Sequence, residues 1–180
     1  VGWRLSSRFP TFSFTSSISI AVVALREFTN ERGEFLITTL PVVEIGATAL
    51  GNTTAHFANG GGWTTQVVLV NPSDMPINGT AQFINRTGQT FQTVPYSLAP
   101  RSSARIVSAS SSSAVQTGSV RLSSPAFAVS IFSLNANGVT VTQAGVPTLP
   151  AGMTFQSYVE NGNTIRSGIA IANPSATAVD

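Results

Sequence analysis

The stretch NGGGWTTQVVLVNPS, residues 59–73, returns later in the chain as NGNTIRSGIAIANPS, residues 161–175. The Asn-Gly pair and the Asn-Pro-Ser turn are both displaced by 102 residues, from 59 to 161 and from 71 to 173. Between them, each copy carries an apolar run of the kind that forms a buried β-strand. A repeat at this spacing predicts tandem modules of about 100 residues, the size of an immunoglobulin-like sandwich.

A second echo runs in the other direction. Residues 18–25, ISIAVVAL, match residues 127–134, FAVSIFSL, at a displacement of 109. A Gly and then a Pro follow in each copy, Gly33 and Pro41 in the first, Gly138 and Pro147 in the second. The two echoes together indicate the second half of one module, a complete module, and the first half of a third.

The predicted fold class is therefore all-β, built from immunoglobulin-like antiparallel β-sandwich repeats with one complete module flanked by partial modules. Residues 1–46 are expected to be the C-terminal half of a preceding module. Residues 51–150 are the complete module, and residues 151–180 are the N-terminal part of a following one.

Strands are expected wherever Val, Ile, Phe and Thr gather between turn residues, and no convincing helix pattern occurs. The expected strands are residues 18–26, 34–39, 64–70, 79–85, 90–97, 103–108, 117–122, 127–134, 138–143, 154–159 and 166–172. Asn71-Pro72-Ser73-Asp74 is expected to end a strand, and Asn137-Gly138 to form a tight hairpin.

Composition excludes several classes of function. Charged residues make up only 9% of the 180, against about 25% in typical soluble domains. All nine basic residues are Arg and they are dispersed, which argues against nucleic acid as a partner because phosphate binding needs clustered positive charge. The chain has no Cys, and this removes disulfides, thiolate zinc sites and cysteine nucleophiles.

No membrane insertion is expected. The apolar run 18–25 is too short to span a bilayer and ends in Arg26-Glu27, so it is interpreted as a buried strand. The Ser- and Thr-rich, Lys-free composition fits an exported protein, and the first residue is Val1 rather than Met. We therefore expect an extracellular or cell-surface location, with the secretion signal upstream of this sequence.

No catalytic residue, metal site or cofactor is predicted. His56 is the only His, and its counterpart under the 102-residue displacement is Tyr158, which indicates a half-buried aromatic position rather than a catalytic base. Gly60-Gly61-Gly62 lacks the Lys and the following helix of a phosphate loop, so it is interpreted as a turn. The seven carboxylates show no paired spacing for acid–base chemistry: Glu27, Glu31, Glu34, Glu44, Asp74, Glu160 and Asp180.

Aromatic side chains are the one feature that would suit a binding module, because sugar rings stack on Trp and Tyr faces. Trp63 aligns with Ile165 and Trp3 with Val120, which favours core packing for both. Tyr96 has no counterpart in the chain, so it is the weak candidate for a ligand-binding residue. The fourth aromatic candidate is Tyr158.

Several of these strings resemble the repeats of large uncharacterised bacterial secreted or cell-surface proteins, of immunoglobulin-like β-sandwich type. The matching residues are His56 to Gln66 (HFANGGGWTTQ), the Asn-Pro-Ser turns, Ala144 to Pro147 (AGVP) and Asn30 to Thr39 (NERGEFLITT). Such repeats often sit beside other immunoglobulin-like or adhesion modules. The resemblance implies a spacer or adhesion role and brings no catalytic residues.

Two functions are therefore expected, and the third possibility is an all-β hydrolase, which would require two acids in one cleft. The first is a non-catalytic structural or adhesive repeat module of an extracellular bacterial protein, a spacer or a weak multivalent binder. Its partners would be neighbouring modules of the same chain, and polysaccharide or another surface protein. The alternative is a carbohydrate-binding accessory module of an exported enzyme, with Tyr96 on an exposed aromatic strip.

Overall fold

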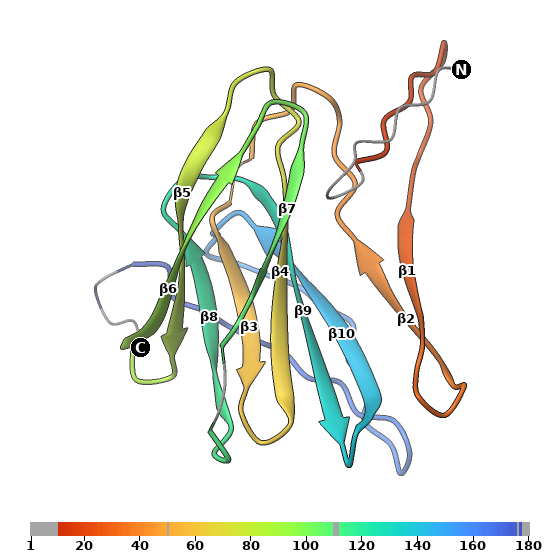
Figure 1. The fold of residues 1–180 in the computed structure, drawn as a ribbon, viewed down its shortest axis with the longest axis vertical. Coiled ribbons are helices and arrows are strands. Elements are labelled where there is room, and N and C mark those ends of the chain that lie inside the picture. Colours follow the sequence, from red (N-terminus) through yellow and green to blue (C-terminus); the bar gives the residue numbers. More distant parts are fainter. Residues whose placement is uncertain (1–10, 50, 110–111, 176, 178–180) are drawn as a thin grey trace.

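The structure is a computed structural model, and it describes residues 11–49, 51–109, 112–175 and 177. This part of the chain forms strands and turns and contains no helix (Figure 1). The strands are β1 (Ala24–Thr29), β2 (Phe35–Leu40), β3 (Thr53–Asn59), β4 (Trp63–Val70), β5 (Ile77–Asn85), β6 (Thr90–Leu98), β7 (Ser103–Val107), β8 (Gln116–Leu122), β9 (Phe127–Ala136) and β10 (Val139–Leu149). The all-β prediction is confirmed.

Strands β3 to β10 form one antiparallel system in the order β6-β5-β8-β3-β10-β9-β4-β7. It folds over on itself in a sandwich-like way, because β10 pairs with β9 along most of its length and with β3 only at its end. Consecutive strands β3 and β4 lie in different layers, whereas an immunoglobulin constant domain places its first two strands in one sheet. The likeness to that fold thus concerns size and layering, not strand order.

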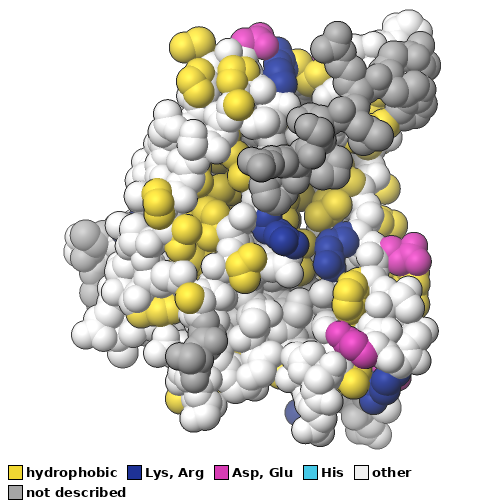
Figure 2. Space-filling model, in the orientation of Figure 1, with side chains coloured by type: hydrophobic (Ala, Val, Ile, Leu, Met, Phe, Trp, Pro, Cys, Tyr) yellow, Lys and Arg dark blue, Asp and Glu magenta, His cyan; other side chains and the backbone are white. Residues whose placement is uncertain are grey.

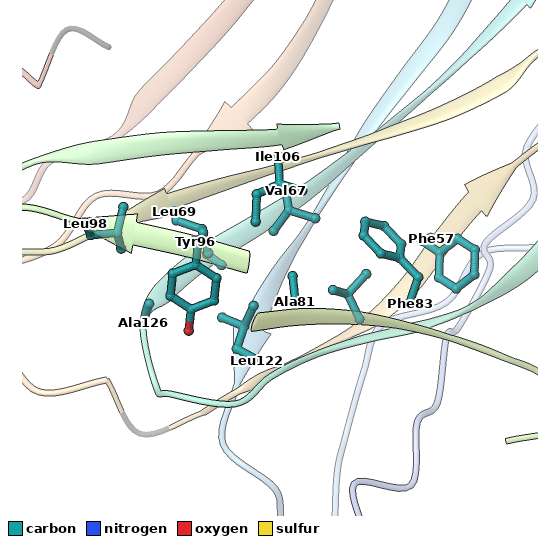
Figure 3. Close-up of a cluster of buried hydrophobic side chains, with 12 residues drawn as sticks. Phe57, Val67, Leu69, Ala81, Phe83, Tyr96, Leu98, Ile106, Leu122 and Ala126 are labelled. Carbon is teal, nitrogen blue, oxygen red and sulfur yellow. The ribbon is translucent and has the colours of Figure 1, made fainter. Parts of the chain in front are cut away.

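The core lies between the two layers and follows the strand alternation. In β4, Thr65, Val67 and Leu69 are buried while the residues between them are partly exposed. The rings of Phe57 and Phe83 meet edge to face with centroids 5.5 Å apart, a favoured aromatic geometry. Figure 3 shows core side chains from strands of both layers, among them Val67 and Leu69 of β4, Phe57 of β3 and Phe83 of β5.

Strand β3 was missed by the sequence analysis. Its pairing with β8 is irregular between Thr54 and Phe57, and a β-bulge of this kind breaks the two-residue alternation. Phe57, Ala58 and Asn59 are moreover all buried in succession. A segment without alternation carries no strand signal in the sequence.

The two turns predicted from the sequence, the hairpin at Asn137-Gly138 and the strand end at Asn71-Pro72-Ser73, are confirmed. Asn137 and Gly138 have φ of 52° and 80°, the left-handed pair that a two-residue hairpin between β9 and β10 requires. Strand β4 ends at Val70, and the Asn71 side chain accepts a hydrogen bond from the Ser73 amide at 3.0 Å. Such side-chain bonds end strands because they offer the backbone a local partner.

Strands β1 and β2 form a separate two-stranded sheet beside β10 (Figure 1). Its tip is fastened to β10 at one residue: the Asn30 Nδ2 donates to the Thr140 carbonyl at 2.9 Å, and the Thr140 amide donates to Glu31 Oε2 at 2.7 Å. The predicted strand at residues 18–26 begins only at Ala24. Residues 18–23 are described but do not pair as a strand.

Residues 151–175, which we call the arm, contain no strand. The strands predicted at 154–159 and 166–172 are therefore wrong for this structure. A strand needs a neighbour to accept its backbone hydrogen bonds, and in the arm only Asn161 and Arg166 form an isolated bridge. Almost every residue of the arm is exposed.

The arm nevertheless reproduces the local hydrogen bonds of the β3–β4 turn at a displacement of 102 residues. The Gly60 amide donates to the Trp63 carbonyl at 3.0 Å, and the Gly162 amide donates to the Ile165 carbonyl at 2.8 Å. A second bond recurs in the same way, from the Ala58 amide to Thr65 Oγ1 at 3.1 Å and from the Glu160 amide to Ser167 Oγ at 2.8 Å.

The Asn-Pro-Ser turn recurs as well. Asn71 Oδ1 accepts from the Ser73 amide at 3.0 Å, and Asn173 Oδ1 accepts from the Ser175 amide at 2.9 Å. In both copies the Asn Nδ2 donates to the carbonyl four residues further on, at 2.8 Å and 2.6 Å. Two segments of different sequence thus share one local geometry.

Candidate functional site

Tyr96, the ligand-binding candidate, lies in the core. Only 7% of its surface is exposed, and its hydroxyl donates to the Ser124 carbonyl at 2.6 Å. Burial raises the pKa of the phenol above its ordinary value. Figure 3 shows the ring among Leu69, Ala126 and Leu122. The exposed position expected for Tyr96 is wrong, because one side of its ring faces core side chains and its hydroxyl is occupied.

The single histidine belongs to a small aromatic cluster at the β3–β4 end of the sandwich. The His56 ring meets the Phe132 ring edge to face at 4.8 Å, and the Trp63 ring lies 5.7 Å from the same Phe132. All three side chains are half-buried, as predicted for His56. Burial lowers the pKa of His56, so the neutral imidazole is favoured.

Phe132 was not singled out from the sequence, because a Phe within an apolar run reads as ordinary core. Its partial exposure follows from its position on β9 near the tip of the β9–β10 hairpin. The cluster offers ring faces and one imidazole. No carboxylate is hydrogen-bonded to His56 among the interactions of the described residues, so the cluster suits contact rather than acid–base chemistry.

The Asp74 carboxylate is engaged in the turn that follows β4. Its two oxygens accept from Arg101 Nε and Nη2, each at 2.8 Å, and this bidentate pair lowers the pKa of Asp74. Both groups lie at the surface, where such a pair contributes little to stability. Arg101 has a φ of 56°, and its guanidinium ties the turn after β6 to the turn after β4.

Two further carboxylates fasten the tip of the β1–β2 hairpin. Glu34 Oε2 accepts from Asn30 Nδ2 and from Arg32 Nη2, both at 2.7 Å, and these bonds lower the pKa of Glu34. The Thr140 amide lowers the pKa of Glu31 by donating to it. Neither acid faces the other as a catalytic pair would.

Metal-ligand groups do not gather in the described ranges: no three His, Cys, Asp or Glu residues there lie close enough to hold an ion. Among the described residues, two polar atoms are buried without a hydrogen-bond partner, Arg121 Nε and Ser133 Oγ. Arg121 lies on β8 between Val120 and Leu122, which face the core, whereas Ser133 lies on β9 opposite the exposed Thr64. They therefore do not form one site. Trp3 and Asp180 lie outside the described residues.

The glycine run at 60–62 is committed to a tight turn. All three glycines have positive φ, and a Cβ on Gly62 would lie 2.3 Å from the Asn135 carbonyl oxygen. The Gly60 and Gly61 amides donate to carbonyls at 3.0 Å. Amides that are already paired in this way cannot cradle a phosphate, which agrees with the interpretation as a turn.

A shallow depression of about 320 Å³ lies where the segment before β3 crosses the Asn-Pro-Ser turn. Its lining is mostly apolar, from residues 46–49, 71–73 and 125–127 together with Ile77. The Gly46 amide donates to the Pro72 carbonyl at its rim, at 3.0 Å. No titratable side chain lines it, so it offers no chemistry beyond apolar contact.

Charged side chains form a few small groups on a largely uncharged surface in the view of Figure 2. A search of the described residues for a helix long and apolar enough to cross a bilayer finds none. The structure thus brings together one half-buried aromatic cluster, His56 with Trp63 and Phe132, and leaves the other candidate residues apart. No protein-family model, no curated protein and no solved structure matches this chain.

Proposed function

We propose that this chain is a non-catalytic structural or adhesive piece of an extracellular bacterial protein, in which β-sandwich modules of immunoglobulin-domain size follow one another. The observation that carries this proposal is the recurrence of side-chain hydrogen bonds at a displacement of 102 residues. The hydroxyl oxygens of Thr65 and Ser167 each accept a hydrogen bond from the backbone amide seven residues earlier. Asn71 and Asn173 each accept one from the amide two residues later, in the same type of turn. Local geometry repeated at a fixed spacing is typical of modules in series.

The placement of the strands supports the proposed division of the chain. Strands β3 to β10 lie between Thr53 and Leu149 and share one core, within the proposed module 51–150. The β1–β2 sheet resembles the β9–β10 hairpin and fits the end of a preceding module. The arm resembles the β3–β4 segment and fits the start of a following one.

The polar groups of the described part support a role without catalysis. Asp74, Glu31 and Glu34 hold turns, and the Tyr96 hydroxyl holds a backbone carbonyl. The low content of charge and the absence of Lys and Cys support an exported protein whose surface is neutral and rich in hydroxyl groups. Neighbouring modules, polysaccharide or another surface protein are the proposed partners.

Thermal unfolding of the full chain tests the spacer version. A ligand at about 100 times its Kd adds about 2.7 kcal/mol of stability, which raises the Tm of a chain of this size by several degrees. We expect an unchanged Tm across metal ions, nucleotides and soluble polysaccharides. A reproducible rise with any one of them would replace the pure spacer with a binding function.

Carbohydrate binding is the second candidate, and the half-buried Trp63 beside Phe132 is the observation that favours it. Ring faces of this kind stack on sugars. In a Trp3→Phe background, Trp63 is the single Trp of the chain, so its fluorescence reports directly on the cluster. If this candidate is right, adding polysaccharide is expected to shift the Trp63 fluorescence, and Phe132→Ala, which removes the neighbouring ring and keeps the fluorophore, should abolish the shift. Unchanged fluorescence would remove it.

A further inference from the structure

The arm has the same pattern of apolar residues as β4, but its apolar side chains are exposed whereas those of β4 are buried in the core. Val67 and Leu69 are 0% exposed, whereas their counterparts Ile169 and Ile171 are 66% and 89% exposed. Each isoleucine left in water lacks the stabilisation that burial of its side chain would provide. The arm thus presents an apolar edge that a partner would stabilise.

The strand that pairs with β4 in the complete module indicates which kind of strand would pair with the arm. Strand β4 pairs antiparallel with β9, with Thr64 opposite Ser133 and Val68 opposite Val129. The arm therefore calls for a β9–β10-like hairpin with a free edge on its β9-like strand. One such hairpin lies in the same chain, formed by β1 and β2.

The strand registers define which residues of the β1–β2 hairpin correspond to which residues of the β9–β10 hairpin. Ala24 lies opposite Leu40, and continuing this register by one residue places Val23 opposite Pro41. In the complete module Val129 lies opposite Pro147. The β1 strand therefore corresponds to β9 at a displacement of 106 rather than 109, since both Val129 and Pro147 match residues 106 positions earlier.

The second edge of β1 is open to another strand. Within the described ranges β1 pairs with β2 alone, and Leu25 and Val23 are among the exposed apolar residues of this hairpin. Unpaired edges with apolar side chains are templates for an added strand. The arm of the same chain does not pair with this edge.

We propose that residues 165–172 of one copy add as an antiparallel strand to the free edge of β1 of a second copy, in the register of β4 on β9. This inference rests on the repeat organisation proposed above. The mode is strand addition to a sheet edge, and because the two surfaces differ, the contact is heterologous.

Charge complementarity supports this register. Thr64 corresponds to Arg166 and Ser133 to Glu27, so the β4–β9 register places Arg166 opposite Glu27. Opposite charges on facing strand positions are favourable. The complete module has an uncharged pair at this point, so the two charges complement each other only between the arm and β1.

Disulfide trapping tests the register directly, because the chain has no Cys of its own. The register places Ala170 opposite Val23, as Val68 lies opposite Val129. Chains carrying only Val23→Cys are mixed with chains carrying only Ala170→Cys and oxidised. We expect a cross-linked dimer of the two different chains. The matched control replaces Ala170→Cys with Tyr158→Cys, a position that is also exposed and lies outside residues 165–172.

Sedimentation at increasing concentration supplies a second measurement. Ile169→Asp with Ile171→Asp is expected to abolish association without loss of the fold, since both side chains are exposed in the single chain. Glu27→Arg should weaken association about two- to fivefold. Adding Arg166→Glu to the same chain should restore it.

Three outcomes would overturn the pairing: no cross-link between the mixed chains, an equal yield with the Tyr158→Cys control, or a cross-link formed inside one chain that carries both cysteines. None of these outcomes would contradict the spacer proposal, which would instead be contradicted by a ligand-dependent rise in Tm. Conversely, a ligand that binds the complete module would leave the strand pairing intact. The two failures are therefore distinguishable.

Discussion

Residues 53–75 and residues 155–177 have matching sequence patterns and matching turns but opposite surroundings. In the first segment Val67 and Leu69 fill the core, and in the second Ile169 and Ile171 lie in water. The side-chain hydrogen bonds of Thr65 and Asn71 are reproduced by Ser167 and Asn173. Turn geometry is thus determined within a few residues, whereas strand formation depends on a partner.

The energetic difference between the segments follows from that distinction. A turn bond between a side chain and a nearby amide costs little chain entropy, because the loop that it closes is short. A strand must order its whole backbone, and it recovers that cost only when a neighbour buries its side chains and accepts its amides. Strand β4 has two such neighbours, β7 and β9, and the arm has none among the described residues.

The largest difference is expected at the core positions of the two segments. Leu69→Ala should lower the free energy of unfolding by about 2–5 kcal/mol, because it leaves a cavity in the core. Ile171→Ala, its counterpart, should change it by no more than about 0.5 kcal/mol. Urea denaturation of dilute samples gives both values. Equal losses would mean that the arm is packed in the folded chain.

A smaller contrast is expected at the Asn-Pro-Ser turns. Asn71 donates to the carbonyls of Met75 and Ala99, at 2.8 Å and 3.0 Å, and is buried. Asn71→Ala leaves these carbonyls without their hydrogen-bond donor and should lower the free energy of unfolding by about 2–3 kcal/mol. Asn173→Ala breaks the same local bonds in water and should leave the global unfolding transition unchanged. A shift of that transition in Asn173→Ala would contradict the separation.

The hydroxyls that clamp the β3–β4 turn should differ by less. Thr65 Oγ1 donates to the Ala58 carbonyl at 2.7 Å and is fully buried. Thr65→Val keeps the shape and should cost about 1–2 kcal/mol. Ser167→Ala should have no measurable effect on the thermal transition, and it serves as the control. A neutral Thr65→Val would show that shape alone holds the turn.

The smallest effect concerns pH and is expected only for the first of the two segments. Burial lowers the pKa of His56 below its ordinary value of 6.5, so the unfolded chain binds a proton at a higher pH than the folded chain. Stability is therefore complete above about pH 6.5 and falls as the pH drops through the folded pKa. His56→Phe should flatten the Tm in this window. The arm carries Tyr158 at this position, so Tyr158→Phe should not.

The sequence predicts the β-class and most strands well, because alternation and turn residues are local signals. Strand β3 was lost because the bulge between Thr54 and Phe57 removes alternation. The strands predicted at 154–159 and 166–172 have the right local pattern but lack a neighbour. Pairing is a property of segments distant in sequence, and no local pattern reports it.

The candidate residues were predictable in part. The half-buried aromatic position of His56 follows from its alignment with Tyr158. Tyr96, which has no counterpart, is the candidate for the exposed aromatic strip that carbohydrate binding requires, but its ring fills core space and its hydroxyl donates to the Ser124 carbonyl. A residue without a counterpart in the repeat is not necessarily exposed. A Tyr can be buried when its hydroxyl has a hydrogen-bond partner, and the sequence does not show whether it has one.

Backbone amide hydrogen exchange is the most direct test of the claim that a partner, and not the sequence pattern, separates the two segments. In dilute full-length chain we predict slow exchange for the amides of residues 65–70 and fast exchange for residues 167–172. At high concentration, protection should appear in 167–172 and in β1 together. Protection of 167–172 in dilute, monomeric chain would contradict the account, because it would mean that the arm forms its strand without a second copy.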